Sequence, residues 1–113
     1  MSGKRIYVAG AYSANNVTSV LDNIRIGIRY ATKLMLQGDY PWCPWTDFLY
    51  ALLLRENETL TVDDYYRYSM AWLEVSETLH VLPNSENSTG TNKEIARAFW
   101  LDIPIKFLTE EDL

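Results

Sequence analysis

Cysteine and histidine each occur only once in this sequence, as Cys43 and His80. One cysteine excludes an intramolecular disulfide and disfavours a cysteine-based zinc site within one chain. No second histidine is present to share a metal ion with His80, so we expect no metal site. Because apolar residues flank His80 in the run TLHVL, we interpret it as a core or sheet-edge residue rather than a catalyst.

Basic residues and long apolar runs are also scarce. The chain has 10 Lys and Arg against 15 Asp and Glu, a net charge of −5. Binding to nucleic acid or to an anionic membrane needs clustered positive charge, so we expect neither partner, although a small nucleotide can still bind locally. No segment approaches the ~20 apolar residues of a membrane span. The opening MSGKRIYVAG lacks the apolar segment of a signal peptide, so we expect a cytoplasmic protein.

The residues that are present describe one globular domain over 1–113, since 48% of the 113 residues are hydrophobic and 13% are aromatic. Segments with strand and helix patterns alternate along the chain, which predicts an α/β fold. We expect a Rossmann- or flavodoxin-like parallel sheet of four to five strands with helices on both faces. Strands are predicted at 4–10, 78–82 and 103–108, with a short one in the proline-containing 40–45; helices are predicted at 18–37, 46–55, 61–75 and 93–101; and the tail 109–113 is expected to fray.

Two polar loops follow predicted strands, GAYSANN at 10–16 and PNSENSTGTNKE at 83–94. In parallel sheets ligands bind beyond the carboxyl ends of the strands, so both loops are candidates for a site. GAYSANN has one glycine and matches neither GxGxxG nor GxxxxGK[ST], which disfavours conventional NAD binding and ATP hydrolysis. The second loop offers hydroxyl and backbone NH groups that suit a sugar or a phosphate.

Glu94 follows the second loop, and its position has two compatible interpretations. Thr91 and Glu94 have the spacing of a helix capping box. Alternatively, Glu94 is a catalytic carboxylate beside a ligand loop, with its ionised, nucleophilic form favoured by the positive end of the helix. The pattern alone does not separate the two. The aromatic-rich middle of the chain is expected to be core or subunit interface, with one or two rings free to stack on a base.

Taken together, these segments resemble the nucleoside 2-deoxyribosyltransferase-like family, which includes deoxynucleoside 5′-monophosphate N-glycosidases and small phage-type relatives. The resemblance covers nearly the whole chain. It rests on KRIYVAGAYS, on the Asn23-x-Arg25 pattern, on GDYPWCP and on the S-x-G-x-x-x-E motif formed by Ser88, Gly90 and Glu94.

The resemblance implies a reaction and a set of site residues. Glu94 stands at the position of the family's nucleophile, which attacks the anomeric carbon of a 2-deoxyribosyl group and releases the base. The glycosyl group then passes to water or to another base, without a metal or an organic cofactor. Tyr7 would orient Glu94, and Ser88 would hold a 5′-phosphate. The implied substrate-binding residues are Gly10, Tyr12, Ser13, Asn23, Arg25, Ser69, Ser88 and Gly90. A homo-oligomer, at least a dimer, is also implied.

Ser69 departs from the family pattern, because relatives often have an Asp there that assists departure of the base. The pattern favours Asp63 and Asp64 as residues of a helix start, and either could replace this acid only if its helix points it into the pocket. Two other functions stay open: a non-catalytic protein that binds a nucleotide or nucleotide-derived signal in the same pocket, and a structural protein with a vestigial pocket.

Overall fold

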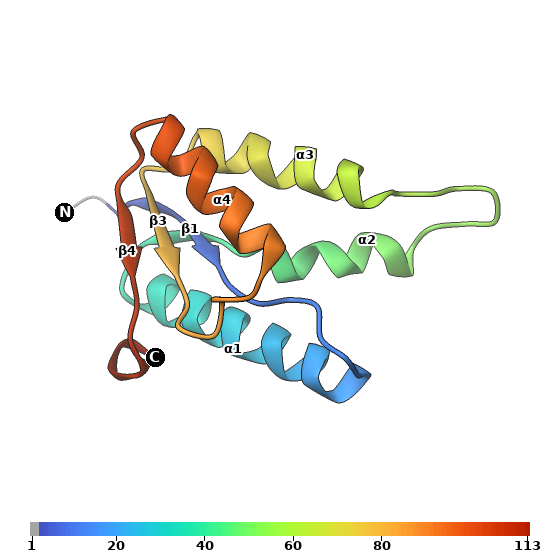
Figure 1. Cartoon of the computed structure of the whole chain (residues 1–113), viewed down its shortest axis with the longest axis horizontal. Coiled ribbons are helices and arrows are strands. Elements are labelled where there is room, and N and C mark those ends of the chain that lie inside the picture. The colour runs from blue at the N-terminus through green and yellow to red at the C-terminus, as the bar shows by residue number, and fades with distance from the viewer. Residues whose placement is uncertain (1–2) are drawn as a thin grey trace.

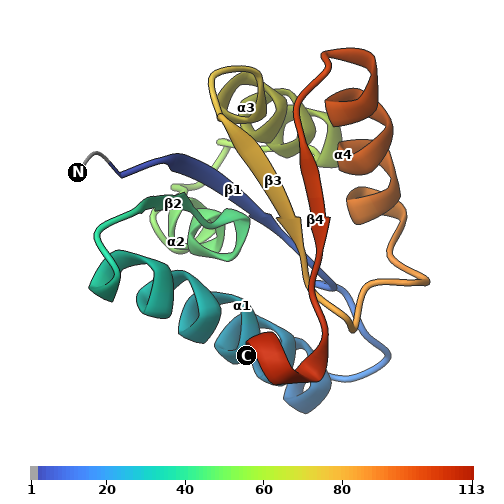
Figure 2. The ribbon, with the colours of Figure 1, turned by 90° about the vertical axis from the view of Figure 1, so that its left-hand side faces the viewer.

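The computed structural model describes residues 3–113, which form a four-stranded, all-parallel sheet with helices on both faces (Figures 1 and 2). The strand order is β2-β1-β3-β4, with β1 central. The fold class predicted from the sequence is therefore confirmed, with four strands. The strands are β1 (Arg5–Ala9), β2 (Tyr40–Trp42), β3 (Thr78–Val81) and β4 (Ile105–Phe107), and the helices are α1 (Val17–Leu36), α2 (Phe48–Leu52), α3 (Val62–Glu74) and α4 (Thr89–Trp100).

The alternation of side chains along β1 explains the two layers of core. Ile6 and Val8 face α1, where they join a buried cluster that includes Trp45 and Leu34. Tyr7 and Ala9 point to the other face, where they pack in a cluster with residues of α3 and α4. A strand buried on both faces reads as a continuous apolar run, which is how IYVA appears in the sequence. In the described part of the chain, no helix has the length and hydropathy of a membrane crossing.

The structure corrects three predicted boundaries. The helix expected over 46–55 is a 3₁₀ turn, Pro44–Asp47, followed by the short α2. Helix α4 begins at Thr89 rather than at 93, because Ser88 caps it. The acidic tail does not fray but forms a 3₁₀ turn with a capping box between Thr109 and Asp112. The Lys33 amine fixes this turn to α1 by donating to the carbonyl oxygen of Asp112 at 2.6 Å.

Candidate functional site

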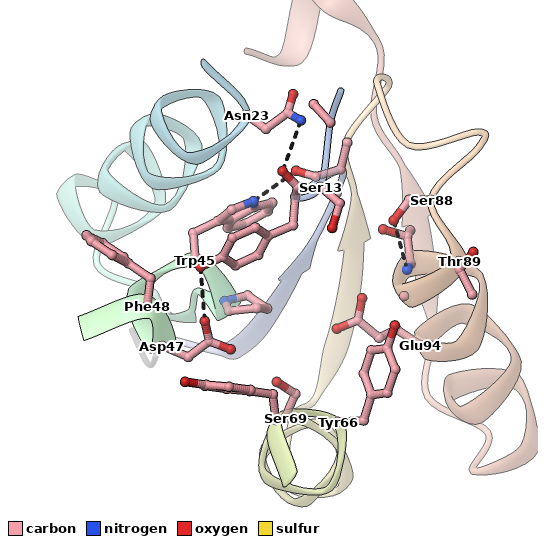
Figure 3. Close-up of a pocket in the computed structure, with 18 of the residues that line it drawn as sticks. Ser13, Asn23, Trp45, Asp47, Phe48, Tyr66, Ser69, Ser88, Thr89 and Glu94 are labelled. Atoms are coloured by element: carbon pink, nitrogen blue, oxygen red, sulfur yellow. Dashed lines mark hydrogen bonds between the residues drawn. The ribbon is translucent and has the colours of Figure 1, made fainter. Parts of the chain in front are cut away.

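A pocket of about 800 Å³ opens beyond the carboxyl ends of β1 and β3 (Figure 3). The chain connections reverse direction between these two central strands, which is where open parallel sheets bind ligands. The walls come from the loop between β1 and α1, one side of α1, the 3₁₀ turn with α2, one side of α3, and the start of α4 with the loop before it. The two loops identified in the sequence therefore meet at one site.

Glu94 lies in the wall formed by α4, and the structure shows that it does not cap this helix. Ser88 occupies the N-cap, where its hydroxyl accepts a hydrogen bond from the Thr91 NH at 3.2 Å. Glu94 lies well beyond the first turn, so the Thr91–Glu94 capping box is wrong. Its side chain is 8% exposed and lines the pocket. The phenol of Tyr7, fully buried in β1, donates a hydrogen bond to Oε2 of Glu94.

Burial determines the protonation of this pair. Desolvation raises the pKa of Glu94 from 4.5 to about 7, the Tyr7 hydrogen bond opposes this increase, and the charge of Asp47 adds to it. Desolvation and the neighbouring Glu94 charge hold the pKa of Tyr7 well above its usual 10.0, while Ser69 acts in the opposite direction. Tyr7 therefore stays a neutral donor, and Glu94 is close to half ionised at neutral pH.

Asp47 is a second pocket carboxylate that the sequence analysis missed. It occupies the N-cap position of α2, yet its side chain makes no capping hydrogen bond there. It is 8% exposed and lines the pocket, and the Tyr12 phenol donates to its Oδ1 at 3.3 Å. Desolvation raises the pKa of Asp47, and the Tyr12 hydrogen bond opposes this. Its only signal in the sequence was an acidic residue just after a predicted strand end, which read as an ordinary helix start.

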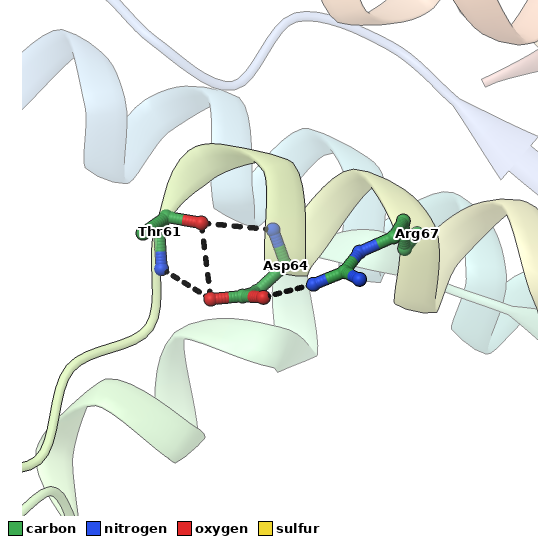
Figure 4. A network of polar contacts seen from close by, with 3 residues as sticks. All are labelled: Thr61, Asp64 and Arg67. Carbon is green, nitrogen blue, oxygen red and sulfur yellow. Dashed lines mark hydrogen bonds and ion pairs between the residues drawn. The ribbon is translucent and has the colours of Figure 1, made fainter.

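The acids that the sequence analysis considered lie elsewhere. Asp64 forms a capping box with Thr61, accepting from the Thr61 NH at 2.8 Å, and pairs with Arg67 (Figure 4). Hydrogen bonds from Thr61 and Arg67 lower the pKa of Asp64, so it is ionised and committed to the helix end. Asp63 lines a separate pocket to which α3 and Lys93 of α4 contribute. Neither carboxylate is placed to protonate a ligand in the pocket.

Of the other site residues predicted from the sequence, all but Arg25 line the pocket. Those that line the pocket are Gly10, Tyr12, Ser13, Asn23, Ser69, Ser88 and Gly90. Arg25 does not: its side chain is 68% exposed and pairs with Asp22 at 3.0 Å. Residues two apart on a helix point in directions about 200° apart, so Asn23 and Arg25 cannot share the pocket face. Asn23 instead fixes the loop by donating to the carbonyl oxygen of Tyr12 at 3.2 Å.

Trp45 supports the same loop from below the pocket. Its Nε1 donates to the carbonyl oxygen of Ala11 at 2.9 Å. The indole packs so closely on Gly27 of α1 that a Cβ there would lie 2.3 Å from the ring. With Tyr12, Phe48, Tyr65 and Tyr66, Trp45 gives the pocket flat apolar walls of the kind that stack on a heterocycle.

The pocket is acidic overall. None of its lining residues, all within the described chain, is Lys, Arg or His, whereas Asp47 and Glu94 both contribute carboxylates. Residues 3–113 contain no group of three or more His, Cys, Asp or Glu side chains arranged to hold a metal ion. The chemistry that this chain can supply at the pocket is therefore that of carboxylates, phenols, hydroxyls and helix NH groups.

Comparison with known proteins places the chain in a family. A family model described as "Domain of unknown function (DUF7768)" matches residues 4–108. The chain belongs to the DUF7768 family. The DUF7768 chain is also similar to the solved structure of a 2-deoxyribosyltransferase from Bacillus psychrosaccharolyticus, with a TM-score of 0.61 and 15% identity over 91% of this chain and 70% of that one. At this identity the similarity is one of fold. No curated protein sequence matches the chain.

Proposed function

We propose that this protein cleaves or transfers the N-glycosidic bond of a deoxynucleoside or its 5′-monophosphate, with Glu94 as the nucleophile. The observation that carries the proposal is the buried Glu94 carboxylate, which faces the pocket and accepts a hydrogen bond from Tyr7 instead of capping its helix. The fold similarity to a 2-deoxyribosyltransferase supports the same reaction class.

The mechanism is a double displacement. The Glu94 carboxylate forms an ester bond to C1′ as the C1′–N bond breaks, and the base leaves with the electron pair of that bond. Water or a second base then displaces Glu94 from C1′, with retention of configuration. Positive charge develops on the sugar in both transition states, and an acidic, partly desolvated pocket stabilises that charge. Tyr7 keeps the carboxylate oriented by its hydrogen bond to Oε2.

The start of α4 would hold the sugar or its phosphate. Ser88, Thr89 and Gly90 line the pocket at the N-terminus of α4, and the first NH groups of a helix lack partners within the helix and suit an anion. Thr91 is 1% exposed, and its Oγ1 has no hydrogen-bond partner within residues 3–113. A buried hydroxyl without a partner is costly unless a ligand or water satisfies it. These groups are the reason to test both deoxynucleosides and their 5′-monophosphates.

The test is a chromatographic assay for free base. Purified protein is incubated with the common deoxynucleosides and their 5′-monophosphates, with and without a second base, beside the Glu94→Ala variant. We expect release from at least one substrate, with no release by the variant even though circular dichroism shows that it is folded. Undiminished release by Glu94→Ala would eliminate Glu94 as the nucleophile. A new nucleoside formed with the second base would identify a transferase rather than a hydrolase.

A second candidate is a protein that binds a nucleotide or nucleotide-derived signal without cleaving it. It is favoured by Ser69, which lines the pocket where relatives have an acid, and by the pKa of about 7 for Glu94, which leaves this carboxylate half protonated at neutral pH. A bound ligand recovered chemically intact after long incubation, with an increase in melting temperature, would support this function. Release of free base would exclude it.

We also propose that the protein is a homo-oligomer. The loop between α2 and α3 extends away from the sheet with the adjoining helix ends (Figure 1). This arm exposes large apolar side chains: Leu52 is 67% exposed, Leu53 81% and Val62 67%. Gathered apolar surface of this kind is typical of interfaces. Sedimentation velocity at micromolar concentration should show at least a dimer, and Leu53→Asp should shift it toward monomer. A monomeric wild-type protein would contradict the proposal.

A further inference from the structure

We propose that Asp47 is the catalytic acid that protonates the departing base. The inference rests on the proposed N-glycosidic chemistry and assigns a step that Ser69 cannot perform. Asp47 and Glu94 lie on opposite walls of the pocket, with the space for a ligand between them (Figure 3). A nucleoside whose C1′ lies against Glu94 would therefore extend its base toward Asp47 and the aromatic rings beside it.

Neither a helix cap nor an ion pair in the described chain explains the burial of Asp47. It makes no capping hydrogen bond at α2, and no Lys, Arg or His in the described chain pairs with it. Burying a carboxylate without a cation is expensive, and such groups concentrate at functional sites. The Tyr12 phenol holds Oδ1 at 3.3 Å, which fixes the carboxyl group and leaves Oδ2 for the pocket.

The two carboxylates divide the work because they interact. Each raises the cost of ionising the other in a pocket without cations, so the pair tends to share one proton. In the empty pocket that proton resides in part on Glu94, whose pKa is about 7. A lone pair on a ring nitrogen or oxygen of the bound base accepts a hydrogen bond and so favours protonated Asp47, which leaves Glu94 ionised. Substrate binding therefore moves the shared proton to the carboxyl group that needs it.

The proton balance of the reaction follows from this assignment. As Glu94 bonds to C1′ and the C1′–N bond breaks, Asp47 transfers its proton to a ring nitrogen or oxygen of the base, which leaves neutral. Asp47 is then a carboxylate. In the second step it accepts a proton from the attacking water, or from an N–H of an incoming base, while that nucleophile displaces Glu94. The protein ends in its starting protonation state.

The experiment compares two substrates that differ in their need for an acid. 2′-Deoxyguanosine requires protonation to leave readily. 7-Methyl-2′-deoxyguanosine already carries a positive charge on its base, and the base departs neutral without a proton. We expect Asp47→Asn to slow base release from the first about 10²- to 10⁴-fold and release from the second less than about 10-fold, after subtraction of enzyme-free hydrolysis. Glu94→Gln should abolish enzymatic release from both substrates. Asp63 is an exposed acid outside the pocket, so the control variant Asp63→Asn should release both bases like the wild-type protein.

A pH profile provides a second readout. Release from 2′-deoxyguanosine should rise with pH as Glu94 ionises and fall again once Asp47 loses its proton, whereas release from the methylated substrate should show the rise without the Asp47-dependent fall. The titratable groups that influence Asp47 or respond to its charge are Tyr7, Tyr12, Cys43, Tyr68 and Glu94, and the phenols and the thiol stay protonated in this range because burial raises the pKa of each.

The outcomes distinguish the role of Asp47 as the acid from the role of Glu94 as the nucleophile. Equal losses on both substrates in Asp47→Asn, or no loss on either, would overturn the role of Asp47 while leaving Glu94 as nucleophile. If the wild-type protein releases base from the methylated substrate but not from 2′-deoxyguanosine, no acid operates. That result would also overturn the role of Asp47 and leave Glu94 as nucleophile. No enzymatic release from either substrate or from any deoxynucleoside would overturn both proposals.

Discussion

Glu94→Gln is expected to stabilise the folded protein at pH 8 by about 3 kcal/mol while abolishing base release. The reason is that burial raises the pKa of Glu94 from 4.5 to about 7 in the folded state. At pH 8 the wild-type protein must keep an ionised carboxylate in a desolvated site, and each unit of raised pKa costs about 1.4 kcal/mol. Glutamine carries no charge and still offers an oxygen to the Tyr7 phenol.

The effect should depend on pH in a defined window. Between pH 4.5 and about 7 the folded protein holds the Glu94 proton that the unfolded chain has lost, so wild-type stability falls as pH rises through this range. The stabilisation by Glu94→Gln should therefore be greatest above pH 7 and small near pH 4.5. Urea unfolding at pH 5 and pH 8 measures it, and the exposed Glu86→Gln is the matched control. Equal stability of wild type and Glu94→Gln at pH 8 would show that burial does not raise the pKa of Glu94.

Trp45→Ala is expected to cost about 3–5 kcal/mol of stability, the usual range for removing a large buried ring. Trp45 is 1% exposed and belongs to the cluster that joins the sheet to α1. The close approach of Gly27 to the indole ring means that α1 is shaped around this side chain, so the cavity cannot collapse easily. The variant also loses the hydrogen bond to the Ala11 carbonyl, which holds the pocket loop.

Two further tryptophan variants separate packing from loop support. Trp45→Phe keeps most of the ring but not the donor, so it should cost less stability than Trp45→Ala yet still weaken ligand binding. Trp100→Ala is the matched control, because Trp100 is 66% exposed and its loss should change stability by at most about 0.5 kcal/mol. Urea unfolding gives the stabilities, and the ligand-induced increase in melting temperature gives the binding. A Trp45→Ala protein as stable as Trp100→Ala would contradict the assignment of Trp45 to the core.

The sheet was predictable because its signal is local. KRIYVAG and TLHVL are short apolar runs that end at polar loops, and a strand buried on both faces requires such a run. The position of Glu94 opposite Tyr7 followed from the family resemblance rather than from the pattern. The start of α4 was misplaced because Ser88 and Thr91 are both good caps, and the choice between them depends on which first turn packs on the sheet.

Asp47, Asp64 and Arg25 show what the sequence could not provide. Each is a charged residue in or beside a predicted helix. The packing of the helix decides where Asp47 and Arg25 point, whereas Asp64 follows the local Thr-x-x-Asp capping pattern of a helix start. Asp64 accepts hydrogen bonds in the capping box with Thr61, and Arg25 points outward, where it forms an ion pair with Asp22. Asp47 faces the pocket because the segment after β2 forms a 3₁₀ turn instead of the long helix expected there, which changes the direction of every side chain in it.

The hydrogen bond between Tyr7 and Glu94 joins residues 87 positions apart in the chain. The parallel sheet favours such separations, since neighbouring parallel strands cannot be joined by a short hairpin, and β2 and three helices lie between β1 and β3 in the chain. Folding of such topologies is slow, because the chain must close long loops before the contacts that reward closure can form. A fragment without β1 lacks Tyr7, and a fragment without α4 lacks Glu94, so neither fragment can form the pocket. Ligand binding during refolding would therefore follow the last docking event rather than early helix formation, and it would serve as a reporter of complete folding.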